Sequence, residues 1–140
     1  MSLLSFRKDE ILRRQKLIDR LFAEGNSFFI YPYKIFWLIT PPETKFPAQI
    51  LISVGKKAFK QAVDRNRIKR QIREIYRLNK HQLYDHFDKN QRQCVMAIIY
   101  TANVHLPTED LEIKIKAVLK RLYTEIDKKL NNPSPCLSDN

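Results

Sequence analysis

The residues best suited to a chemical task are the cations of the segment Ser53–Lys80, which contains ten Lys or Arg residues and two acidic residues. The segment has a net charge of +8, which is most of the +11 carried by the 140-residue chain. The densest part is the triplet Arg65, Asn66 and Arg67. Guanidinium and ammonium groups bind phosphate oxygens, and a strongly basic surface attracts polyanions. The segment therefore predicts nucleic-acid binding, with an anionic membrane surface as the alternative.

A helix over residues 60–79 separates these cations from apolar side chains. At 100° per residue the apolar arc contains Ile68, Ile72, Ile75 and Tyr76, and the neighbouring arc contains Asn66, Lys69, Arg70, Arg73 and Arg77. Solvated helix surfaces usually mix signs at i to i+4 spacing, and on this arc Glu74 alone is available to neutralise the cations. A polyanion on this face is favoured over a solvated surface. Asn66, a neutral amide between two arginines, either reads a sugar or base edge or fixes the helix to the domain.

Aromatic residues supply a second candidate surface. In a strand over residues 33–40, Lys34, Phe36 and Leu38 share one face, and the opposite face carries Tyr33, Ile35, Trp37 and Ile39. A lysine beside an aromatic ring can hold single-stranded nucleic acid by stacking and charge. The alternative, favoured by the apolar pattern, is a strand buried on both sides. Phe22, near the end of a first helix, is similarly expected to be a core anchor rather than a stacking platform.

Catalysis by protein side chains is not predicted. The apolar strands carry no Asp or Glu, and His81 and His86 lack the cysteines or carboxylates that would complete a metal site. The glycines, Gly25 and Gly55, cannot form a glycine-rich phosphate loop. We therefore expect binding residues, no catalytic residue and no metal ligand.

The chain also lacks the sequence signs of export. Its N-terminal apolar run is interrupted by charge after six residues, and no eighteen apolar residues run together. Cys94 and Cys136 lie far apart and suggest no disulfide framework. A reducing, cytoplasmic location is expected.

The elements that must position these residues form one α+β domain over residues 9–130. A loose arm at 1–8 and a disordered, proline-containing tail at 131–140 are expected to flank it. Helical spacing and β-rich runs predict helices at 9–24, 60–79 and 108–130 and strands at 27–30, 33–40, 48–54 and 92–100. The first strand is expected at the sheet edge because Pro32 follows it, and the third is apolar enough to be central.

Several motifs resemble the protein subunit of bacterial ribonuclease P. The RNR signature of that family is similar to Lys56-Lys57, Ala62-Val63, Arg65-Asn66-Arg67-Ile68-Lys69-Arg70 and Ile72-Arg73-Glu74. The family's N-terminal block is similar to Leu21-Phe22-Ala23-Glu24-Gly25-Asn26-Ser27. The resemblance covers roughly residues 7–127. It implies an α-β-β-β-α-β-α order, a four-stranded sheet and a left-handed βαβ crossover, as in the second domain of ribosomal protein S5.

The resemblance implies a role in a ribonucleoprotein enzyme that removes the 5′ leader from precursor tRNA. The catalytic RNA, with Mg²⁺ held mainly by RNA and substrate, cleaves the bond. A single protein copy binds that RNA and strengthens metal binding. The implied RNA-binding residues are Lys56, Lys57, Arg65, Asn66, Arg67, Lys69, Arg70 and Arg73. The resemblance also assigns Phe22 and Phe36, with Lys34 beside them, to a leader-binding cleft instead of the core. The alternative function is a non-enzymatic RNA-binding or ribosome-associated protein.

Overall fold

The computed structural model describes residues 10–40, 48–81 and 93–131. The elements in chain order are α1 (Gln15–Glu24), β1 (Asn26–Ile30), β2 (Tyr33–Thr40), β3 (Ala48–Val54), α2 (Ala62–Asn79), β4 (Gln93–Tyr100) and α4 (Thr108–Asn131). The predicted α+β class and element order are confirmed. The expected arm at residues 1–8 lies outside the described residues, as does the expected tail from residue 132 onward.

The four strands form one sheet in the order β1-β2-β4-β3, with β1, β2 and β4 antiparallel and β3 parallel to β4. Helix α2 connects the two parallel strands and completes the βαβ unit. The prediction that the third strand is central was wrong, because β3 lies at the edge. The most buried strand is β4, which lies between β2 and β3 and has nearly all of its residues buried.

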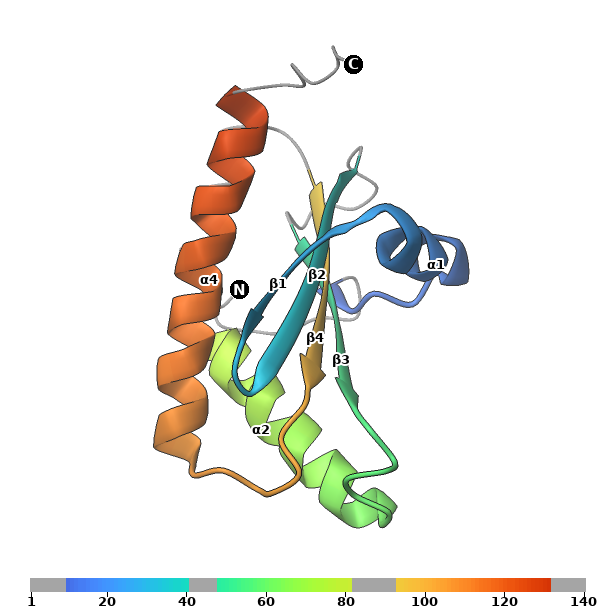
Figure 1. Cartoon of the computed structure of the whole chain (residues 1–140), viewed down its shortest axis with the longest axis vertical. Coiled ribbons are helices and arrows are strands. Elements are labelled where there is room, and N and C mark those ends of the chain that lie inside the picture. The colour runs from blue at the N-terminus through green and yellow to red at the C-terminus, as the bar shows by residue number, and fades with distance from the viewer. Residues whose placement is uncertain (1–9, 41–47, 82–92, 132–140) are drawn as a thin grey trace.

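Helices cover the two faces of the sheet (Figure 1). Helices α2 and α4 pack on one face, over a core that includes Phe28, Ile35 and Trp37 of the strands. Helix α1 packs on the other face, where Leu17 and Leu21 meet Val95, Ala97 and the half-buried Phe36 and Leu38. The predicted alternation of β2 is therefore confirmed, and its Lys34 face is only partly covered.

The first helix starts later than predicted. It begins at Gln15, because the preceding residues pair with the edge of β3 instead of coiling: Ile11 bridges Ile50, and the Leu12 amide donates to the Ile50 carbonyl oxygen at 2.8 Å. Next to this bridge, the carboxylate of Glu10 forms a buried ion pair with the ammonium group of Lys80 at the end of α2. The segment before α1 is thus attached to both β3 and α2.

Residue 25 connects α1 to β1, and it is a glycine because a side chain would not fit there. A Cβ at this position would lie 3.0 Å from the carbonyl oxygen of Trp37. It would also overlap the carbonyl oxygen of Leu21. The Gly25 amide caps the helix by donating to the Leu21 carbonyl oxygen at 2.9 Å. This close approach holds the end of α1, and with it Phe22, against β2.

Candidate RNA-binding site

Helix α2 presents the predicted arc of basic residues, which is called the ridge below. Its four predicted apolar residues, Ile68, Ile72, Ile75 and Tyr76, are all buried. The exposed side carries Asn66, Arg67, Arg70 and Arg73, with Lys69 half-buried beside them. The two-sided helix deduced from spacing is therefore confirmed.

The one acid of the ridge is already paired. Glu74 accepts hydrogen bonds from Arg77 Nε at 3.0 Å and Nη2 at 2.5 Å. This bidentate contact lowers the pKa of Glu74, so that carboxylate stays ionised at neutral pH. Arg67, Arg70 and Arg73 form no ion pair with any described residue, which leaves them available to phosphate.

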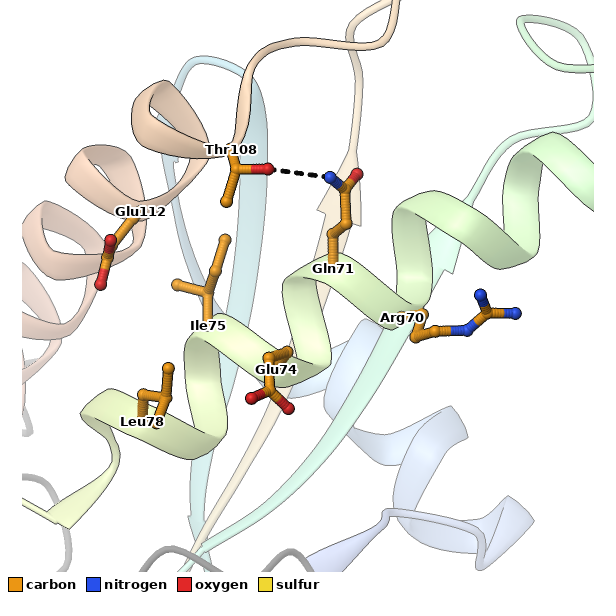
Figure 2. Close-up of a pocket in the computed structure, with 7 residues that line it drawn as sticks. All are labelled: Arg70, Gln71, Glu74, Ile75, Leu78, Thr108 and Glu112. Carbon is orange, nitrogen blue, oxygen red and sulfur yellow. Dashed lines mark hydrogen bonds between the residues drawn. The ribbon is translucent and has the colours of Figure 1, made fainter.

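The ridge spans the width of the helix. Lys69 and Arg73 line a hollow of about 110 Å³ together with Ile11 and residues 50–52, so they stand over the edge of β3. Arg70 borders the hollow between α2 and α4, and Figure 2 shows its guanidinium pointing away from that hollow. A polyanion lying along the outer side of α2 could contact all three cations.

The hollow between α2 and α4 is a poor site for phosphate. It measures about 430 Å³ and is lined by Ile75, Leu78 and two carboxylates, Glu74 and Glu112 (Figure 2). A hydrogen bond of 2.9 Å from Gln71 to Thr108 closes one side. Because its lining is mainly apolar and its two carboxylates are already ion-paired with Arg77 and Lys116, this hollow offers a phosphate little and lies outside the proposed interface.

Arg65 has a structural partner that the sequence did not suggest. Its Nη1 donates to the carbonyl oxygens of Phe59 at 2.8 Å and Lys60 at 3.0 Å. The guanidinium thus holds the loop that carries the exposed residues Lys56 and Lys57 directly after β3. The available signal was helical phase, since Arg65 lies three residues before the buried Ile68 and hence beside the apolar arc.

Replacing Arg65 with Ala should loosen this loop. We expect faster hydrogen exchange at the Phe59 amide, which donates to the Gly55 carbonyl oxygen at 3.3 Å, and a loss of stability of about 1 kcal/mol. Arg67→Ala removes the same charge without touching the loop and serves as the control. Equal exchange in the two variants would show that Arg65 does not hold the loop.

The second predicted surface lies on the opposite face of the sheet. The rings of Phe22 and Phe36 meet edge to face, with centroids 4.9 Å apart and planes at 65°. Lys34 Nζ stands 5.6 Å from the Phe36 centroid. The structure therefore brings all three predicted cleft residues together. Phe22 is 42% exposed, so the expectation that it is a core anchor was wrong.

Two further aromatics near this cleft were missed. Phe29 and Tyr31 are 50% and 51% exposed and lie at the hairpin between β1 and β2. The sequence signal was the pair Phe28-Phe29, because adjacent strand residues face opposite sides and one of the two must leave the core.

Cys94 is an inert core residue. Burial raises the pKa of its thiol to about 12, which suppresses the reactive thiolate at neutral pH. Within the described residues, no three His, Cys, Asp or Glu side chains gather closely enough to hold a metal ion.

Comparison with known proteins places this geometry in a family. The family profile described as Ribonuclease P matches residues 6–123, which include both surfaces. The chain belongs to the ribonuclease P protein family. The ribonuclease P protein component of Porphyromonas gingivalis is 36% identical over 96 residues, covering 69% of this chain and 70% of that protein. The component of Chlorobaculum tepidum is 36% identical over 129 residues, covering 84% and 82%.

Solved ribonuclease P proteins share the fold. One from Staphylococcus aureus superposes with a TM-score of 0.63 at 21% identity, covering 82% of this chain and 89% of that one. One from Thermotoga maritima also gives 0.63, at 22% identity, covering 80% and 96%. Over the described part of the chain, no helix has the length and apolarity needed to cross a membrane.

Proposed function

We propose that this chain is the protein subunit of a ribonuclease P holoenzyme, which removes the 5′ leader from precursor tRNA in the cytoplasm. The ridge on α2 binds the catalytic RNA, and the Phe22–Phe36 cleft holds the single-stranded leader. One copy of the chain serves each holoenzyme. The observation that carries this proposal is the Phe22–Phe36 ring pair with Lys34 beside it, on the face of the sheet opposite the unpaired arginines.

The ridge suits a structured RNA because its contacts depend on charge. Exposed arginines bind phosphate oxygens in any sequence, and each contact releases counterions. They would fix the position of the protein on the catalytic RNA without reading its bases. Affinity for that RNA should therefore fall steeply as salt rises.

The cleft suits a single strand because it offers ring faces and edges to unpaired bases. Every base can stack on an aromatic ring, so the contact tolerates different leader sequences. Lys34 would neutralise a phosphate beside the stacked base. Part of the free energy of substrate binding would then depend on the presence of a leader.

Bond cleavage is assigned to the RNA subunit. The described residues do not supply a cluster of carboxylates, histidines or cysteines that would fit a Mg²⁺ ion. In this proposal the described residues bind RNA and hold no catalytic metal. Mg²⁺ held by the RNA and the substrate would supply that chemistry.

Reconstitution with a bacterial ribonuclease P RNA at low Mg²⁺ tests the proposal. The protein should raise affinity for precursor tRNA and the rate of cleavage, and the gain in affinity should grow with leader length. If precursor tRNA binding and cleavage are the same with and without the protein, the proposed function is wrong.

Replacing Phe36 with Ala should weaken binding of leader-containing substrate by about 1–3 kcal/mol. Leaderless tRNA should bind as it does with the unsubstituted protein. Ile113→Ala, which removes an exposed apolar side chain from α4, is the matched control. Equal losses for the two substrates would indicate damage to the domain rather than loss of stacking.

A further inference from the structure

Phe29 and Tyr31 form an exposed aromatic pair that the cleft described above does not use. Their ring centroids lie 6.4 Å apart with planes at 62°, and half of each side chain faces solvent. Two large rings exposed side by side gain free energy when a ligand covers them. The pair is thus a candidate binding surface.

Phe29 lies on the same face of the sheet as the cleft, and Tyr31 contacts it from the turn that follows β1. Phe28 packs into the core beneath α2 and α4, so its neighbour Phe29 projects toward the α1 side. Phe29 stands directly opposite Lys34 in the β1–β2 register, and Ser27 stands opposite Phe36. Phe29 is therefore displaced from Phe36 by one strand and by two residues, or about 7 Å along the strand.

Lys34 links the two aromatic pairs. It faces Phe29 across the strands and approaches the Phe36 ring on its own strand. The sequences of all four strands contain no Asp or Glu that would oppose an anion here. A cation between two ring pairs favours an anionic ligand with flat apolar groups over an uncharged apolar partner.

The hairpin turn that carries Tyr31 is fixed to the sheet. The amide and the hydroxyl of Thr101 donate to the Pro32 carbonyl oxygen at 2.7 and 2.9 Å. Because the turn is tied to the end of β4, the ring pair is presented in a set position. A ligand that stacks on it would lose little affinity to ordering the protein.

We propose that Phe29 and Tyr31 form a second stacking site for single-stranded RNA. The site continues the Phe22–Phe36 cleft across β2 to the edge strand β1, with Lys34 neutralising the phosphate between the two. This inference rests on the leader binding proposed above and adds a second group of leader nucleotides to it.

Holoenzyme variants and precursor tRNAs with leaders of increasing length test the second site. The double variant Phe29→Leu/Tyr31→Leu keeps apolar bulk but removes the rings. We expect it to weaken binding roughly 5- to 150-fold, starting at a leader length different from that at which Phe36→Ala begins to lose affinity. Phe29→Trp should retain affinity, and Ile113→Ala should match the unsubstituted protein at every length.

The outcomes separate this inference from the proposed function. If Phe36→Ala shows a leader-dependent loss and the double variant shows none, the second site is wrong and leader binding stands. An equal loss of leaderless tRNA in the double variant would place the rings against another part of the complex and would also overturn the inference. If even the unsubstituted protein gives no leader-length dependence, both proposals fail together.

Discussion

Replacing Lys80 with Met should lower the free energy of unfolding by about 3–5 kcal/mol. The ammonium group of Lys80 and the carboxylate of Glu10 are both almost inaccessible to solvent, with exposed side-chain fractions of 2% and 0%. Replacing the ammonium group with an apolar side chain removes a cation that neutralises this buried carboxylate. Chemical denaturation followed by circular dichroism would measure the loss.

Two controls define the cause of that loss. Lys116→Met removes an exposed lysine whose ion pair with Glu112 is 3.9 Å long, so its effect should stay below about 1 kcal/mol. The double variant Glu10→Leu/Lys80→Met should recover part of the lost stability, since it removes both charges of this buried pair. Similar free energies of unfolding for Lys80→Met and Lys116→Met would show that the buried ion pair contributes no more to stability than the exposed one.

Replacing Arg67, Arg70 and Arg73 together with Ala should weaken binding to ribonuclease P RNA at least about 100-fold near physiological salt. These arginines form no ion pair with a described residue, so each can give up its counterion to a phosphate. The slope of log affinity against log salt should become shallower by about 2–3. Filter binding or fluorescence titration over a salt series would measure both quantities.

The matched control removes the same charge from α4. Lys114, Lys120 and Lys128 are exposed there, and their replacement with Ala also lowers the net charge by three. We expect a smaller change in the salt slope because these lysines lie off the ridge. Equal slopes for the two triple variants would mean that overall charge, rather than α2, governs RNA binding.

Local pattern predicted most of the fold. The bounds of β2 and β3 match the expected ones, because strong alternation or apolar runs end at proline or glycine. The buried face of α2 follows directly from the spacing of Ile68, Ile72 and Ile75. In these segments local preference and tertiary packing agree, so spacing alone sufficed.

The errors arise where distant residues decide the outcome. Ile11 fits a helical apolar face, yet it pairs with β3. Lys80 counts toward the basic segment, yet Glu10, seventy residues away, draws it out of solvent. No spacing rule links such positions, so the sequence overstated the exposed positive charge of α2 and placed the start of α1 too early.

The candidate site was predicted in outline for the same reason. Helical phase separated the ridge from the core, but which arginines have partners depended on contacts with Glu74 and with the 55–61 loop. Phe22 looked like a core residue because its spacing matches Leu21 and Ile18. In the structure it is exposed beside Phe36, which spacing does not reveal.

The bridge from Ile11 and Leu12 to Ile50 also bears on the solution behaviour of the protein. An open strand edge is a template for pairing with another chain, and natural sheets block such edges to avoid aggregation. The Leu12 amide occupies the Ile50 carbonyl oxygen on the outer side of β3. Deletion of residues 1–12 would uncover the apolar edge strand β3, and we expect the shortened protein to self-associate through this strand.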